Sequence, residues 1–155
     1  MKDDYETIAK IIRANAYAKG GMDGRVVFTN GCFDILHPGH LDVIKKCREV
    51  AGPRGTVVVA LNSDESVRRL KGASRPIMSE AARLEMVANI VGVDYSVSFD
   101  EDTPWELIES LRPEVIVKGG EYKADEVVGA ELAVVVIVPT REGFSTTDIV
   151  RKAGG

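Results

Sequence analysis

Five short runs of apolar, β-branched residues recur along the chain and predict strands. In the second and fifth runs the valines are consecutive, as in Val57-Val58-Val59, and do not alternate with polar residues. Continuous apolar runs are typical of strands buried on both faces, because a strand with one solvent-exposed face alternates apolar and polar side chains. The five predicted strands span residues 25–29, 56–61, 95–99, 115–118 and 133–138.

Segments with helical periodicity and helix-capping residues separate these strands. The alternation predicts an α/β fold: a Rossmann-like, doubly wound parallel sheet of five strands with helices on both faces, with its ligand at the carboxyl ends of the strands. We expect residues 1–24 to form an N-terminal helical extension and residues 25–155 to form the functional domain. The predicted helices comprise residues 1–20, residues 41–50 before Gly52-Pro53, a helix capped by Ser79 with an apolar stripe at Leu84, Val87, Ala88 and Val91, a helix opened by the capping box Thr103-Pro104-Trp105-Glu106, and a last helix after Ser145-Thr146-Thr147.

Composition narrows the class of protein. A chain of 155 residues with 45% hydrophobic and 28% charged residues is ordinary globular composition, sufficient for one domain with its own core. A formal net charge of −4 argues against nucleic acid as the main partner, because such binding needs a basic surface. No apolar run approaches the ~20 residues of a membrane span. Two cysteines and no charged-then-apolar leader lead us to expect a reducing cytoplasm.

The segment between the first strand and the next helix holds both histidines of the chain. It reads Thr29-Asn30-Gly31-Cys32-Phe33-Asp34-Ile35-Leu36-His37-Pro38-Gly39-His40. A strand-to-helix junction presents backbone N–H groups and the positive end of a helix dipole, which attract phosphate. Pro38 fits the first helical turn, so we expect His37 and His40 to point into one cavity. Two imidazoles beside a phosphate would donate hydrogen bonds to oxygens that gain charge in a transition state.

A zinc site is the competing interpretation of the same segment, because Cys32, His37, His40 and Cys47 are all possible ligands. Neither C-x-x-C nor H-x-x-x-H spacing is present, and Cys47 falls on the apolar face of a predicted helix. We therefore assign no side-chain metal ligand and interpret Cys47 as a core residue.

The tetrad His37-Pro38-Gly39-His40 resembles the H-x-G-H signature of the cytidylyltransferase-like nucleotidylyltransferase superfamily. Further blocks, in order and at similar spacing, resemble the heptose-1-phosphate adenylyltransferases, the nucleotidyl-transferring half of bacterial ADP-heptose synthesis. The resemblance covers about residues 25 to 152. Its blocks are Asn30-Gly31-Cys32-Phe33-Asp34-Ile35-Leu36-His37, Leu61-Asn62-Ser63-Asp64, Leu70-Lys71-Gly72 with Ser74-Arg75-Pro76, Phe99-Asp100-Glu101-Asp102-Thr103-Pro104, Val117-Lys118-Gly119-Gly120-Glu121-Tyr122 and Ser145-Thr146-Thr147.

This resemblance implies that residues 25–155 form a nucleotidylyltransferase domain. It implies that a phosphate oxygen of D-glycero-D-manno-heptose 1-phosphate attacks the α-phosphate of a nucleoside triphosphate, most simply ATP, and that pyrophosphate leaves. Mg²⁺ would be bound with the triphosphate, and the partners would be the two substrates and a second copy in a homodimer. The product would supply activated heptose for lipopolysaccharide. Such chemistry needs positioning and charge neutralisation of an in-line displacement rather than a covalent intermediate.

The resemblance also implies roles for individual residues. His37 and His40 would hold the triphosphate and stabilise the pentavalent α-phosphate, and Arg48 would add the basic group that the family has at this position. Loop or substrate positioning would fall to Asp34, Asn62, Asp64, Arg75 and Arg141. Nucleotide-binding residues would be Thr29, Asn30, Gly31, Cys32 and Phe33 at the strand end, Lys118, Gly119 and Gly120 as the base-recognition loop, and Ser145, Thr146 and Thr147 as the loop over the β and γ phosphates.

Two features depart from the adenylyltransferase pattern. The segment before the last strand is short, because Gly129-Ala130-Glu131-Leu132 runs almost directly into Val134. The tail Arg141-Glu142-Gly143 resembles that of glycerol-3-phosphate cytidylyltransferases, although the arginine stands one place nearer the glycine. A cytidylyltransferase acting on glycerol 3-phosphate therefore stays an alternative, and a non-catalytic nucleotide-binding module of the same fold is a third hypothesis. The base and the anomer of the sugar phosphate stay open.

Overall fold

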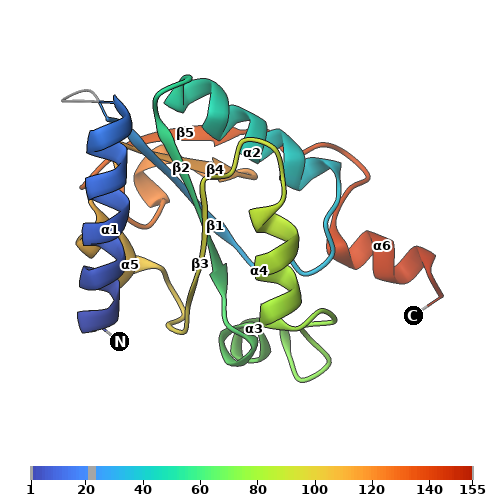
Figure 1. The fold of residues 1–155 in the computed structure, drawn as a ribbon. Coiled ribbons are helices and arrows are strands. Elements are labelled where there is room, and N and C mark those ends of the chain that lie inside the picture. Colours follow the sequence, from blue (N-terminus) through green and yellow to red (C-terminus); the bar gives the residue numbers. More distant parts are fainter. Residues whose placement is uncertain (1, 21–23, 155) are drawn as a thin grey trace.

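A single parallel sheet of five strands forms the centre of the computed structural model, which describes residues 2–20 and 24–154 (Figure 1). The strand order is β3-β2-β1-β4-β5, and every neighbouring pair is parallel. The order reverses between β1 and β4, which places the topological switch point at the carboxyl end of β1. The strands are β1 (Val26–Gly31), β2 (Thr56–Asn62), β3 (Tyr95–Phe99), β4 (Val115–Gly119) and β5 (Val134–Val138). The predicted fold class is confirmed.

Helices cover both faces of the sheet (Figure 1). One core lies between the sheet and α1 and α5, and the other lies between the sheet and α2 and α4. Along β1 the side chains alternate between the two, since Val26 and Phe28 belong to the first core and Val27 to the second. The helices are α1 (Lys2–Gly20), α2 (Pro38–Ala51), α3 (Asp64–Lys71), α4 (Glu80–Ala88), α5 (Trp105–Leu111) and α6 (Thr146–Lys152), with a short 3₁₀ helix η2 (Ala124–Glu126).

The leading helix α1 is an integral layer of the fold. Its buried residues Tyr5, Ala9, Ile12 and Ala16 follow one helical stripe and pack in the same core as Leu107 of α5. The predicted boundary at residues 24 and 25 falls in the connection between α1 and β1. Because α1 shares a core with the sheet, this boundary does not separate two folding units.

Two local predictions are wrong, and one helix was missed. The helix α3 was not predicted, and its eight residues bury only Ser66 and Val67. The expected capping box at Thr103 does not form: Pro104 occupies the N-cap position of α5, without a side-chain hydrogen bond. Val91 lies beyond the end of α4 and is 95% exposed, since the helix ends at Ala88.

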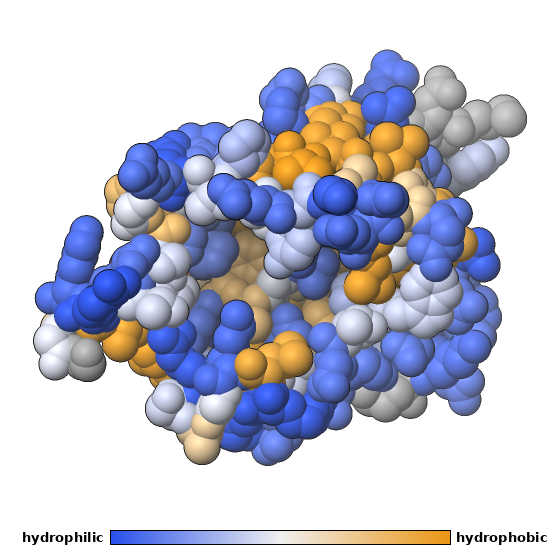
Figure 2. Space-filling model, turned by 180° about the vertical axis from the view of Figure 1, so that it is seen from behind, coloured by the Kyte–Doolittle hydropathy of each residue, from blue (hydrophilic) through white to orange (hydrophobic). Residues whose placement is uncertain are grey.

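Among the described residues, no helix is long and apolar enough to cross a membrane. The face of the molecule opposite to the view of Figure 1 is hollowed near its centre, and hydrophilic residues surround the hollow (Figure 2).

Candidate active site

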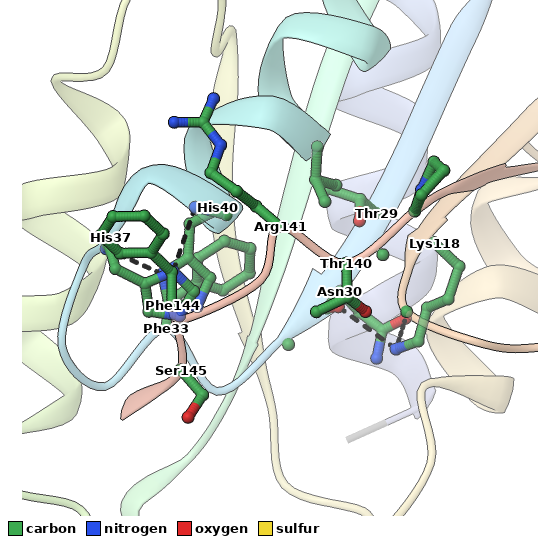
Figure 3. A pocket seen from close by; sticks show the side chains of 16 residues that line it. Thr29, Asn30, Phe33, His37, His40, Lys118, Thr140, Arg141, Phe144 and Ser145 are labelled. Atoms are coloured by element: carbon green, nitrogen blue, oxygen red, sulfur yellow. Dashed lines mark hydrogen bonds between the residues drawn. The ribbon is translucent and has the colours of Figure 1, made fainter. Parts of the chain in front are cut away.

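Two cavities lie beyond the carboxyl end of β1, and the first of them also adjoins the carboxyl end of β4. The first has a volume of about 250 Å³ and the second of about 450 Å³, and Phe33, His40 and Ser145 line both. The first is lined by Thr29, Asn30, Gly31, Phe33, His37, Gly39, His40, Val43, Lys118, Gly119, Gly120, Pro139, Thr140, Arg141, Phe144 and Ser145 (Figure 3). The second is lined by Cys32, Phe33, Asp34, His40, Val67, Lys71, Ser74, Arg75, Ser145, Thr146 and Thr147.

His37 and His40 are fixed by the first turn of α2. His37 is the N-cap residue, and its Nδ1 accepts a hydrogen bond from the Gly39 N–H at 3.1 Å. The Nδ1 of His40 accepts one from the His37 N–H at 3.2 Å, which completes a reciprocal capping box built from two imidazoles. The two rings are stacked with their centroids 3.8 Å apart. A Cβ on Gly39 would lie only 2.9 Å from Cε1 of His37, so the absence of a side chain at Gly39 leaves room for this ring.

This geometry sets the tautomer and the charge of both imidazoles. Because each Nδ1 accepts a backbone N–H, each neutral ring carries its proton on Nε2 and can donate it to a ligand. Burial lowers the pKa of His37 below its usual value. Burial, together with the nearby His37, lowers the pKa of His40 to about 4. Both rings are therefore neutral hydrogen-bond donors at pH 7.

Asp34 connects the strand exit to the loop before α4. Its buried carboxylate accepts hydrogen bonds from the backbone N–H groups of Ile77 and Met78, at 2.8 to 2.9 Å. The guanidinium of Arg75 lies 3.7 Å from the same carboxylate. Phe33, immediately before Asp34, has a φ of 51°, so the chain turns sharply here. Asp34 thus holds the loop that carries Arg75 beside the second cavity.

The sequence analysis missed Arg83, which is 1% exposed although it carries a full charge. Its Nη1 donates to the carbonyl oxygen of Cys32 at 2.7 Å and to that of Asn62 at 2.8 Å. Cys32 directly follows β1, and Asn62 is the last residue of β2. Its Nε donates to Met78 O, and its Nη2 pairs with Asp64 at 2.9 Å. Arg83 therefore joins two strand ends and the loop that Asp34 also holds. One sequence signal existed, because Arg83 lies four residues before Val87 on the buried face of α4.

Asn62 and Asp64 line neither cavity, although the sequence analysis placed them near the substrates. Asn62 is buried, and its amide donates to Ser66 Oγ at 3.0 Å. Asp64 pairs with Arg83. Both residues lie beneath the second cavity as parts of its supporting hydrogen-bond network.

Lys118 ends β4 beside the first cavity. Its Nζ points toward Asn30 and lies 3.4 Å from the Asn30 carbonyl oxygen (Figure 3). The same Nζ lies 5.7 Å from the centre of the Tyr122 ring. Burial lowers the pKa of Lys118. Gly119 has no room for a side chain, because a Cβ there would lie 2.6 Å from Val43 of α2. The glycine therefore lets α2 and the end of β4 form adjoining walls of the cavity.

The segment after β5 closes the site from another side. Ser145 is the N-cap residue of α6, and its Oγ accepts from the Asp148 N–H and donates to the Asp148 carboxylate. Thr146 and Thr147 line the second cavity only. Arg141 lines the first cavity and forms an ion pair with Asp42 of α2.

The placement of Arg48 in the catalytic site is wrong. Arg48 lies eight residues after His40, a rise of about 12 Å along α2, and its guanidinium faces the opposite edge of the sheet. There it donates to the carbonyl oxygens of Gly52 and Gly55 and pairs with Asp94 at 2.9 Å. Two other basic side chains, Arg75 and Lys71, line the second cavity, and Lys71 had no assigned role within the quoted Leu70-Lys71-Gly72 block.

Within residues 2–20 and 24–154, no group of three or more His, Cys, Asp or Glu side chains could hold a metal ion. The nearest carboxylate, Asp34, is already bonded to two backbone N–H groups and faces Arg75. The residues that the structure describes therefore offer no carboxylate cage at these cavities. A divalent ion would fit here only with most of its ligands supplied by a bound phosphate chain and water.

Comparison with known proteins identifies similar sequences. The profile of a family described as "Cytidylyltransferase-like" matches residues 28–152. Proteins named "Bifunctional protein HldE" are 49% identical over 148 residues in Nitrobacter hamburgensis, 52% over 136 residues in Bradyrhizobium diazoefficiens and 53% over 135 residues in Koribacter versatilis. These matches cover 92%, 84% and 84% of this chain but 29%, 27% and 27% of the relatives. The chain thus spans less than a third of the curated relatives it matches.

Solved structures share the fold. A lipopolysaccharide core biosynthesis protein from Thermoplasma volcanium matches with a TM-score of 0.60 and 26% identity, over 76% of this chain and 96% of that one. A macrolide-efflux protein from Streptococcus pneumoniae matches with a TM-score of 0.61 over 83% of this chain and 52% of that one. Its 23% identity makes it a likeness of fold alone.

Proposed function

The chain belongs to the cytidylyltransferase-like family, and from this premise we propose that it is a nucleotidylyltransferase that joins ATP and D-glycero-D-manno-heptose 1-phosphate. The products are ADP-heptose and pyrophosphate. The six sequence blocks that resemble heptose-1-phosphate adenylyltransferases support this choice of substrates, as does about 50% identity to relatives named HldE. A solved relative described as a lipopolysaccharide core biosynthesis protein is compatible with it.

The observation that carries the proposal is the common wall of the two cavities. His40, Phe33 and Ser145 line both of them, so two ligands can meet there without sharing a binding site. Nucleotidylyl transfer requires this arrangement, because the attacking oxygen and the leaving pyrophosphate lie on opposite sides of the α-phosphate. We assign the nucleotide to the first cavity and the acceptor to the second.

The imidazoles supply the electrostatic part of the reaction. The Nε2–H groups of His37 and His40 would donate hydrogen bonds to oxygens of the α-phosphate and of the leaving phosphates, whose charge changes as the bond to the acceptor forms. Because the capping box fixes both rings before substrate arrives, these donors need no reorganisation during the reaction. Neither imidazole has to change its protonation state.

The acceptor cavity suits an anion with hydroxyl groups. Lys71 and Arg75 are the cations on its wall, and Ser74 and Thr146 offer hydroxyl groups. We assign the phosphate of the acceptor to Lys71 and Arg75 and its sugar hydroxyls to the polar groups around them. Positive charge here also lowers the repulsion between an acceptor phosphate and the nucleotide phosphates.

We propose that Mg²⁺ enters with the triphosphate, since the described residues offer it no carboxylate cage. When bound, the ion would neutralise charge on the phosphate chain. We also propose that the protein acts as a homodimer in the cytoplasm; light scattering of the purified chain and fractionation of its native cell test these two points.

The test is pyrophosphate release with Mg²⁺, crossing ATP, CTP and GTP with both anomers of heptose 1-phosphate and with glycerol 3-phosphate. We expect turnover with ATP and one anomer of the heptose phosphate. Turnover only with CTP and glycerol 3-phosphate would instead identify a glycerol-3-phosphate cytidylyltransferase. Tight nucleotide binding without any turnover would identify a binding module.

A further inference from the structure

The ion pair between Asp42 and Arg141 joins α2 to the segment after β5. Nε of Arg141 donates to Oδ2 of Asp42 at 2.8 Å, and Nη2 donates to Oδ1 at 2.6 Å. Two parallel hydrogen bonds between a guanidinium and a carboxylate fix both distance and orientation. Figure 3 shows the guanidinium directed away from His37, His40 and Lys118, toward α2.

The residues around Arg141 form one wall of the first cavity. Pro139, Thr140, Phe144 and Ser145 all line it, so the position of this segment decides the shape of the cavity. Within the segment, the Phe144 N–H reaches the Arg141 carbonyl oxygen only at 3.4 Å, a long hydrogen bond. The bidentate pair with Asp42 therefore links this wall to α2, the helix that also carries the two imidazoles.

We propose that Asp42 is a positioning residue for nucleotide binding: through Arg141 it clasps residues 139–145 against α2 and so holds the wall of the first cavity in place. This inference rests on the proposed function, because it assigns the first cavity to the nucleotide. Arg141 acts here through its contact with Asp42 and not through a phosphate. While the pair holds, the Nε–H of Arg141 and one N–H of its Nη2 are directed at Asp42.

A different role for the Asp42–Arg141 pair predicts the opposite change in nucleotide affinity. If Asp42 instead withheld Arg141 from the nucleotide, removing the carboxylate charge would free a cation beside the triphosphate and tighten binding. If the ion pair holds residues 139–145 against α2, as we propose, removing the carboxylate charge loosens the wall of the first cavity and weakens nucleotide binding. The sign of the change in affinity therefore distinguishes the two.

The experiment compares Asp42→Asn, Asp42→Glu and Glu49→Gln with the unaltered protein. Glu49 lies on the same helix, pairs with Lys46 in solvent and makes the matched control for a lost negative charge. Calorimetric titration with ATP and Mg²⁺, without acceptor, measures the dissociation constant, and turnover measures KM and kcat. We expect D42N to raise the dissociation constant and the KM for ATP about three- to fivefold, the amount that a partly exposed ion pair contributes. We expect kcat to stay within about twofold, D42E to restore most of the affinity, and E49Q to match the unaltered protein.

A tighter or unchanged dissociation constant in D42N overturns the proposal, as does an equal loss in D42E. Hydrogen exchange of the free protein is the readout that does not depend on nucleotide: amides of residues 139–145 should exchange faster in D42N than in E49Q. If the unaltered protein binds no nucleotide, the proposed function fails, and this exchange measurement still decides whether the clasp exists. Unchanged exchange in D42N refutes the clasp.

Discussion

The two edges of the sheet each contain an arginine that gathers backbone carbonyl groups, yet only one edge is equipped for catalysis. At the carboxyl edge, Arg83 bonds to the carbonyl oxygens of Cys32, Asn62 and Met78 beneath the two cavities. At the amino edge, Arg48 bonds to those of Gly52 and Gly55 and pairs with Asp94. Both arginines are structural. The difference lies in what surrounds them.

At the amino edge the polar groups satisfy one another. Burial by itself would raise the pKa of Asp94, but the hydrogen bond from the Val57 N–H and the nearby Lys19 and Arg48 bring this pKa below its usual value. At the carboxyl edge the backbone is satisfied in the same way, whereas the Nε2–H groups of His37 and His40 stay available at the cavity wall. A cluster of charges therefore indicates function only when some of its donors are left for a ligand.

Replacing Arg83 by Met should produce the largest change, because three buried carbonyl oxygens and Asp64 lose their donor together. We expect a loss of about 3–5 kcal/mol in the free energy of unfolding. Chemical denaturation measures it, and a loss below about 1 kcal/mol would contradict the role of Arg83. As a matched control, Arg68→Met removes a guanidinium that pairs with the exposed Glu65, and it should change stability little.

Replacing His40 by Ala removes one preorganised donor at the common wall. We expect kcat to fall about 100- to 1000-fold, the usual cost of losing one donor to a developing negative charge. Calorimetry should still detect ATP binding, since the first cavity keeps its other walls. A kcat within tenfold of the unaltered protein would refute the assignment of His40 to the reacting phosphate.

Replacing Arg48 by Ala tests the other edge. We expect a loss of about 1–2 kcal/mol in the free energy of unfolding, because the guanidinium is partly exposed and its carbonyl partners reach water once it is gone. The kcat of the folded enzyme should not change. A hundredfold loss of kcat at full folding would restore the catalytic role that the sequence analysis gave Arg48.

The smallest expected effect is on the pH dependence of turnover above neutrality. Since burial keeps the pKa of His40 near 4 and lowers that of His37 below its usual value, both rings are neutral from pH 7 to 8. Over this range kcat should change by less than about twofold on their account. Below pH 6.5 the unfolded chain binds protons that the folded one does not, so stability should fall as the pH drops from 6.5 toward 4. Denaturation at stepped pH checks this sign, and a gain in stability over that range would contradict the low pKa values.

Much of the fold was accessible from local pattern. The continuous valines of β2 and β5 predicted a sheet buried on both faces, and each predicted strand lies within about two residues of the observed one. The helix α3 was missed, because it has only eight residues and buries only Ser66 and Val67. Its N-cap Ser63, its acidic first turn and its basic last turn were signals that the sequence analysis did not use.

The site, like the fold, could be predicted from the sequence only in part. The spacing of His37, Gly39 and His40 was sufficient to place two imidazoles at a helix N-terminus, since the four residues from His37 to His40 form the capping hydrogen bonds among themselves. By sequence pattern alone, three arginines are alike: Arg48, Arg83 and Arg141. In the structure Arg48 lies at the amino edge of the sheet, Arg83 is buried, and Arg141 is paired with Asp42.

The sequence by itself determined the individual strands, the helix start at Pro38 and the imidazole pair, because each depends on residues a few positions apart. Tertiary structure alone decided which arginine supports the site and which does not. The partners of Arg83 stand 5 to 51 positions away along the chain, and those of Arg141 stand 99 positions away. A long, flexible cationic side chain pairs with whatever acceptor the fold brings within reach, and no local pattern records that choice.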